Sequence, residues 1–199
     1  MAVKGSNSTC FVIDYEGKVQ KTLTNHGWTS QLTALTASDI DDDGRLEVVC
    51  GINRGDNLRV FDPDTGDLKW QHNLGDPVTA IVVYPASAGK LLVAGSQSCY
   101  ACAFSGQGAK VWLCNLESPV TRFVITDLSG EHERLLLAGC EDGSTWMIDG
   151  DGQKRRFLPS LDGRITSLWI GILRAGTEPV VIIDSTNTGL SVWSLQHLL

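Results

Sequence analysis

The sequence has no long hydrophobic run and no block of basic residues. No apolar stretch in its 199 residues approaches the roughly 20 that a membrane-spanning helix requires. The densest basic stretch is "QKRRF" at 153–157 and the formal net charge is −7, so the clustered positive charge that binds a phosphate backbone is missing. The N-terminal "MAVKGSNSTC" lacks the hydrophobic stretch of a signal peptide. These absences predict a cytoplasmic protein with no nucleic-acid partner and no membrane partner.

Cysteine does not occur at the spacing of a disulfide framework or a zinc site. Cys50 and Cys140 fall in apolar, strand-like runs where a small hydrophobic residue is suitable. Cys99 and Cys102 form a C-x-x-C pair, but on an extended strand this odd offset sends the two side chains to opposite faces. Zinc would also need a second pair, or histidines at finger spacing, and the sequence has neither. We therefore predict reduced, structural thiols.

Catalytic signatures are missing as well. The sequence contains no G-x-S-x-G, H-E-x-x-H or phosphate-binding loop motif. Its four histidines lie near expected turns and strand ends, at no metal-ligand spacing. We predict that the chain is not an enzyme.

Helical periodicity is also absent, and a repeat takes its place. An apolar-Thr-x-apolar stretch recurs at steps of 46, 42 and 45 residues. Its copies are "LTAL" at 32–35, "VTAI" at 78–81, "VTRF" at 120–123 and "ITSL" at 165–168. A second, β-rich run ends in glycine, as in "LEVVCG", "LLVAG" and "LLLAG", and the same period places Asp184 at the next such position. Since several anchors share one period, the chain is built from repeats.

Each repeat holds four short runs rich in Val, Ile, Leu, Thr and aromatic residues, separated by Gly, Asp, Asn and Ser. Four antiparallel strands in such a repeat are typical of a β-propeller blade. We predict an all-β fold and one β-propeller domain over residues 1–199. The blade repeats are expected at about 1–27, 30–75, 76–117, 118–161 and 162–199. The first would hold only the tail of a second strand and then strands three and four, and the last only three strands. This gives three complete four-stranded antiparallel blades and two partial ones.

The two partial blades leave two ring arrangements open. They stay separate in a five-bladed ring, or the N-terminal strands complete the C-terminal blade and give four blades with a surplus strand. Incomplete blades leave backbone donors and acceptors unpaired at a sheet edge. Such edges predict association with another protein or with a second copy of the chain.

One segment has a more specific resemblance. "VFDPDTGDLKW", from Val60 to Trp70, resembles the tryptophan-docking motif of quinoprotein (PQQ-type) propellers, A-x-D-x-x-T-G-x-x-x-W. Asp62, Thr65, Gly66 and Trp70 match, while Val60 stands where that family has Ala. The resemblance implies that Trp70 packs between neighbouring blades, and we expect the turn through Asp62, Thr65 and Gly66 to hold it.

A second segment, "DIDDDGRLEVVCG", resembles the Asp-rich hairpin of FG-GAP (integrin-like) propeller repeats. The strands "LRVFD" and "LSVWS" are similar to those of WD-repeat proteins, although the Gly-His and Trp-Asp marks of that family are missing. These resemblances imply the fold more strongly than a function, because propellers have many unrelated roles.

The Asp-rich hairpin is the candidate metal site. Oxygen ligands at alternating positions around a glycine, followed by a glutamate, suit Ca²⁺. The expected ligands are the carboxylates of Asp39, Asp41 and Asp43, the backbone carbonyl of Arg45 and the carboxylate of Glu47. The alternative is a solvated turn in which Asp39 bonds its own backbone. No cofactor other than Ca²⁺ is indicated.

The sequence as a whole predicts a noncatalytic β-propeller scaffold that binds proteins or ligands, with one hairpin able to take Ca²⁺. One alternative is a fragment of a quinoprotein-like enzyme. Another is a carbohydrate-binding propeller, in which exposed members of the six tryptophans form a sugar-binding ring. The simpler role for those tryptophans is packing between blades.

Overall fold

The structure is a computed structural model that describes residues 2–4, 9–24, 30–87, 89–126, 134–173 and 178–194. The described residues form β-strands joined by turns, and none of them belongs to a helix that could cross a membrane. In chain order the strands are β1 (Ala2–Lys4), β2 (Thr9–Ile13), β3 (Val19–Thr24), β4 (Leu32–Ser38), β5 (Glu47–Ile52), β6 (Leu58–Phe61), β7 (Leu68–His72), β8 (Val78–Ala86), β9 (Gly89–Ser96), β10 (Tyr100–Ser105), β11 (Lys110–Asn115), β12 (Val120–Thr126), β13 (Leu135–Cys140), β14 (Thr145–Ile148), β15 (Lys154–Leu158), β16 (Ile165–Gly171), β17 (Val180–Ser185) and β18 (Gly189–Ser194).

The strands form five antiparallel sheets, which we number in chain order. Sheet 1 is β1-β2-β3, sheet 2 is β4-β5-β6-β7, sheet 3 is β8-β9-β10-β11, sheet 4 is β12-β13-β14-β15 and sheet 5 is β16-β17-β18. The predicted three complete and two three-stranded sheets are therefore confirmed. The alternative in which the N-terminal strands complete the C-terminal sheet is wrong, because β1–β3 and β16–β18 belong to separate sheets.

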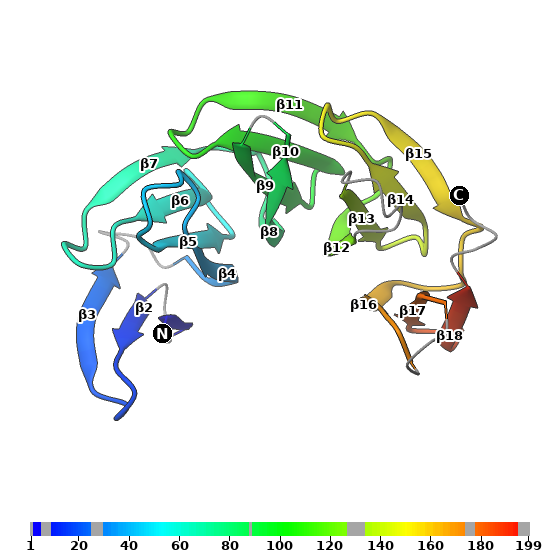
Figure 1. The fold of residues 1–199 in the computed structure, drawn as a ribbon, viewed down its shortest axis with the longest axis horizontal. Coiled ribbons are helices and arrows are strands. Elements are labelled where there is room, and N and C mark those ends of the chain that lie inside the picture. Colours follow the sequence, from blue (N-terminus) through cyan, green and yellow to red (C-terminus); the bar gives the residue numbers. More distant parts are fainter. Residues whose placement is uncertain are drawn as a thin grey trace.

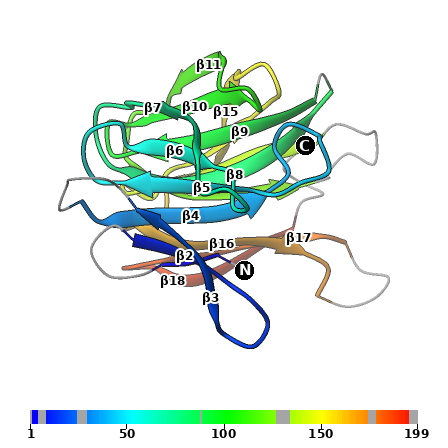
Figure 2. The same ribbon diagram turned by 90° about the vertical axis from the view of Figure 1, so that its left-hand side faces the viewer.

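The sheets stand side by side along an arc (Figure 1). The strands β4, β8, β12 and β16 line its hollow side, while β7, β11 and β15 lie on its convex side (Figure 1). Figure 2 shows the strands of sheet 2 following one another from β4 to β7. Sheets 1 and 5 end the arc on opposite sides of its opening (Figure 1). We call the face that each sheet turns toward the next sheet its forward face, and the opposite face its backward face.

Successive sheets pack through one repeated contact, which explains the glycine anchor of the sequence. Val78, Val120 and Ile165 each begin an inner strand and lie against a glycine of the preceding sheet. Cβ atoms added at Gly51, Gly95 and Gly139 would come within 2.8, 2.6 and 2.6 Å of those three side chains, respectively. Only glycine lets the inner strand approach this closely, so the period of the glycine is the period of the sheet contact.

The threonine anchor has a structural reason of its own. In sheets 2 to 5 the pairing between the first two strands shifts register at the threonine of the inner strand. In sheet 4 the hydroxyl of Thr121 donates to the carbonyl of Gly139 at 2.9 Å, and Thr79 makes the matching bond to Gly95 at 3.2 Å. Thr79 and Thr121 thus each direct a hydroxyl to a backbone carbonyl beside the irregular pairing.

Candidate functional site

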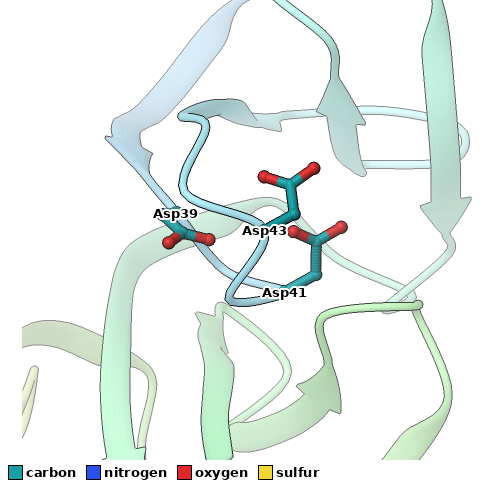
Figure 3. A group of neighbouring side chains, drawn as sticks. All are labelled: Asp39, Asp41 and Asp43. Carbon is teal, nitrogen blue, oxygen red and sulfur yellow. The ribbon is translucent and has the colours of Figure 1, made fainter.

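The acidic hairpin lies between β4 and β5, and all three aspartates come from this one loop (Figure 3). Asp39, Asp41 and Asp43 each offer a carboxylate oxygen, and these oxygens lie within 4.8 Å of one another. The Oδ1 atoms of Asp39 and Asp41 are buried and have no hydrogen-bond partner. Unsatisfied buried carboxylate oxygens are uncommon in proteins, and a bound cation is one way to satisfy them. The structure therefore brings together three of the five expected ligands.

Two lysine side chains form ion pairs with this loop. Lys69 of β7 contacts Asp41 Oδ2 at 2.9 Å and Glu47 Oε1 at 2.8 Å. Lys90, from β9 of the next sheet, contacts Asp42 Oδ1 at 2.7 Å and Asp39 Oδ2 at 3.3 Å. The loop is thus an electrostatic link between sheets 2 and 3, and a cation entering it would compete with two ammonium groups.

These ion pairs shift pKa values in the expected directions. Burial alone would raise the pKa of Asp39, but the hydrogen bond and charge of Lys90 outweigh it and the pKa is lowered. The pKa of Lys69 is raised above its usual range, first by its hydrogen bond to Glu47 and then by that to Asp41. Both pKa shifts favour the charged forms of Asp39 and Lys69.

The other two expected ligands are the carboxylate of Glu47, which is already hydrogen-bonded, and the backbone carbonyl of Arg45, which the side-chain contacts of Arg45 do not test. Glu47 is only 2% exposed and accepts a hydrogen bond from the backbone N–H of Ile40 at 3.0 Å as well as the bond from Lys69. The guanidinium of Arg45 contacts Asp64 Oδ2 at 2.6 Å. Glu47 therefore holds the loop backbone at Ile40 through a buried hydrogen bond, and Arg45 forms an ion pair with the turn between β6 and β7.

Sequence reasoning missed both lysines. Lys69 lies at the register shift between β6 and β7, between the paired residues Leu68 and Trp70, so strand alternation does not predict the direction of its side chain. No local pattern marks Lys90, which reaches the loop only because sheets 2 and 3 stack.

Trp70 is half-buried between sheets, but the turn that receives it belongs to the next sheet. Its Nε1 donates to the carbonyl of Gly106 at 2.9 Å. A Cβ added at Gly108 would come within 2.8 Å of the indole Cγ and Cδ2, so the ring lies flat on this glycine. Gly106 also packs on the acidic loop, since a Cβ there would lie 2.5 Å from the carbonyl oxygen of Ile40.

The same arrangement recurs one sheet further on. Trp112 of β11 donates from Nε1 to the carbonyl of Gly150 at 3.0 Å and lies over Gly152, where an added Cβ would be 2.8 Å from the ring. Each tryptophan therefore fixes the spacing of two neighbouring sheets at their convex side.

The turn of residues 62–66 receives a side chain in the same way, but from sheet 1. Asp62 Oδ1 accepts the backbone N–H groups of Asp64 and Thr65 at 2.8 and 3.1 Å, which lowers the pKa of Asp62. Gly66 receives the side chain of Lys21 from sheet 1, at 3.5 Å from an added Cβ. The expectation that Asp62, Thr65 and Gly66 hold Trp70 is thus corrected: the motif joins three sheets, with its turn facing sheet 1 and its tryptophan facing sheet 3.

The described tryptophans do not form an exposed ring. Trp112 and Trp146 are buried, and Trp193 packs against the core between sheets 4 and 5. Among the described tryptophans only Trp169 is substantially exposed, at 46%. Trp28 lies outside the described residues, as do three of the four histidines. The fourth, His72, packs on Phe104 with ring centroids 4.5 Å apart.

A pocket of about 330 Å³ lies between sheets 1 and 2. Its lining is mainly apolar, with Val12, Val48 and Leu46 among its residues. Its charged groups are Arg45 and Asp64, which pair with each other. This lining offers no acid and base poised for proton transfer.

Comparison with solved structures identifies the architecture. Two crystal structures of BBS1N in complex with ARL6DN, one soaked with lead and one with mercury, each superpose with a TM-score of 0.71 at 14% sequence identity. The match covers 98% of this chain and 56% and 60% of those chains. The chain has a β-propeller fold.

The propeller resembles these chains in fold alone, because the sequence identity is low. It spans less than two thirds of their length. No protein-family model and no curated protein matches the sequence. The resemblances to quinoprotein and FG-GAP repeats therefore stay predictions.

Proposed function

We propose that the propeller is a noncatalytic scaffold that binds other proteins. The observation that carries this proposal is a row of exposed apolar side chains across sheet 5. Trp169, Leu190 and Val192 are 46%, 72% and 52% exposed on three short strands. Exposed apolar residues that cluster on one surface are typical of protein contact sites. BBS1N, a fold neighbour, was crystallised in complex with another protein, which supports a binding role.

The experiment is affinity capture with matched variants of the 199-residue chain. The wild type and Val192→Lys are compared with Val111→Lys, which changes a valine of the same 52% exposure on β11. We expect a defined protein to be retained by the wild type and by Val111→Lys and lost with Val192→Lys. Equal retention by all three chains would contradict the proposal that sheet 5 is the binding surface.

A second candidate function is Ca²⁺ binding at the acidic hairpin. The buried, unpartnered Oδ1 atoms of Asp39 and Asp41 favour it. Asp39, Asp41 and Asp43 would hold the ion, whose charge would replace part of the attraction now supplied by Lys69 and Lys90. Because two ammonium groups must be displaced, we expect affinity in the millimolar range of extracellular modules. In a cytoplasmic setting, which the free cysteines favour, the hairpin would then act as a structural link only.

A further inference from the structure

We propose that two copies of this chain associate head to tail, with the forward face of sheet 5 in one copy packed on the backward face of sheet 1 in the other. This proposal deepens the proposed function and rests on it, since it names the partner of the exposed row. The contact would use the same two faces that meet between sheets within the chain, but without the inner strand of the incoming sheet.

Leu190, on the forward face of sheet 5, occupies a position that is buried in every preceding complete sheet. The register of the third strand against the second places Leu190 where sheet 2 has Leu58, sheet 3 has Ala101 and sheet 4 has Thr145. These three are 0% exposed, and Leu190 is 72% exposed. Leu190 is a large apolar residue at a position where the complete sheets bury a side chain against the next sheet, so we expect this position to be covered by a partner.

A cross-strand row completes this surface. Trp169 pairs with Ile182, which pairs with Val192. The alternate residues Val181 and Ile183 face the other way, into the core with sheet 4. The row therefore lies on the forward face, in the place that Val49 and Val60 occupy between sheets 2 and 3.

Sheet 1 is built as a sheet with a neighbour on its backward side. Cys10, Val12 and Leu23 pack toward sheet 2, which leaves Phe11 and Thr22, a cross-strand pair, on the backward face. The turn between β2 and β3 also resembles the turns that receive a side chain from the preceding sheet. Asp14 Oδ1 accepts the N–H groups of Glu16 and Lys18, each at 2.9 Å, and Gly17 has φ +83°. The corresponding glycines of sheets 2, 3 and 4 each carry a side chain from the preceding sheet, whereas a Cβ at Gly17 would meet nothing within 4 Å.

One substitution in the repeat favours sheet 1 as the occupant over an ordinary four-stranded sheet. Asp184 stands at the position of Gly51, Gly95 and Gly139, and the hydroxyl of Thr166 donates to its Oδ2 at 2.5 Å. In the internal contacts that glycine makes room for the first residue of the incoming inner strand. A carboxylate there would clash with an aliphatic side chain and lose its hydration.

The described part of sheet 1 offers no such inner strand at this place. Its turn at 14–17 joins β2 to β3 as the turns of the complete sheets join their third and fourth strands, so β1 corresponds to a second strand. Sheet 1 can therefore pack on Trp169, Ile182 and Val192 while the carboxylate of Asp184 remains open to water. In one molecule the two faces lie across the opening of the arc, so the contact forms between copies (Figure 1).

The test is sedimentation velocity of the purified 199-residue chain from about 1 µM to about 200 µM. We expect the mass to rise with concentration past the dimer, because a head-to-tail contact leaves both ends free to add further copies. Val192→Lys and Leu190→Lys should each weaken association at least about tenfold. Thr22→Glu should do the same from the other side, and Val111→Lys should leave association unchanged.

Mixing the two kinds of defective chain separates this geometry from any other. Val192→Lys keeps its sheet 1 intact and Thr22→Glu keeps its sheet 5 intact, so the mixture should form dimers and nothing larger. A chain that stays monomeric throughout, or an association insensitive to Thr22→Glu, would overturn the proposal. If the chain is monomeric but Val192→Lys still abolishes capture of another protein, the head-to-tail contact is wrong and the proposed scaffold function stands.

Discussion

The contact between Trp70 and Gly108 predicts a large coupling energy between two sheets. Gly108→Ala places a methyl group in the left-handed region, at φ +85°, which costs about 1–2 kcal/mol. The same methyl would lie 2.8 Å from the indole, and overpacking of this kind costs about 1–3 kcal/mol more. We therefore expect Gly108→Ala to lower the free energy of unfolding by about 2–5 kcal/mol. In a Trp70→Ala background only the backbone cost remains, so the coupling energy should be about 1–3 kcal/mol.

Urea unfolding followed by far-ultraviolet circular dichroism measures all four chains of this cycle without depending on the tryptophan signal. Gly17→Ala is the matched control, because its φ of +83° is nearly the same and an added Cβ meets nothing within 4 Å. It should lose only about 1–2 kcal/mol. If Gly108→Ala and Gly17→Ala cost the same, or if the cycle shows no coupling, the indole does not dock on this turn.

Three further predictions concern other parts of the fold. Glu117 has φ +68° where the equivalent Gly75 has φ +85°, so Glu117→Gly should stabilise the protein by about 0.5–1 kcal/mol in urea unfolding, despite losing an exposed ion pair. Asn57 is fully buried and bonds the backbone of residues 74 and 76; Asn57→Ala should cost about 2–4 kcal/mol, and a loss below about 1 kcal/mol would contradict this role. The pKa of Asp62 is lowered on folding, so ionised Asp62 stabilises the protein fully above its unfolded pKa of about 4. This contribution to the free energy of unfolding is lost as the pH falls through the folded pKa. Asp62→Asn should therefore reduce the decrease in the free energy of unfolding at acid pH, as measured by unfolding curves at a series of pH values.

Ca²⁺ binding is tested by calorimetry and thermal unfolding. Millimolar Ca²⁺ should raise the melting temperature, Asp41→Asn should abolish the effect, and Lys90→Met should strengthen it by removing a competing charge. No heat of binding in wild type and in Lys90→Met would show that the hairpin is a turn held by its lysines.

The repeat could be read from the sequence because the sheet contacts impose it. Gly51, Gly95 and Gly139 recur where inner strands approach closely, and the threonines recur at the register shift. Strand alternation and turn chemistry then place the remaining strands. Contacts between sheets could not be read in this way. The partners of Trp70 and Trp112 lie 36 and 38 residues further along the chain, and no local pattern links donor to acceptor.

The acidic hairpin shows a second limit. Its spacing correctly brought Asp39, Asp41 and Asp43 together, because alternate residues around one glycine share a loop. The spacing could not show that Glu47 turns into the loop interior or that Lys90 arrives from another sheet. Charge compensation depends on tertiary packing, which the local sequence does not encode.

Hydroxyl-radical footprinting with mass spectrometry, at about 1 µM chain, tests most directly whether sheet 5 presents an uncovered contact face. Leu190 and Val192 should be oxidised readily and Trp169 with them, whereas Leu58 and Val60, at the matching positions of sheet 2, should be protected. If Leu190 and Val192 are protected as strongly as Leu58 and Val60 in the monomer, the face is already covered within the chain and cannot be the binding surface.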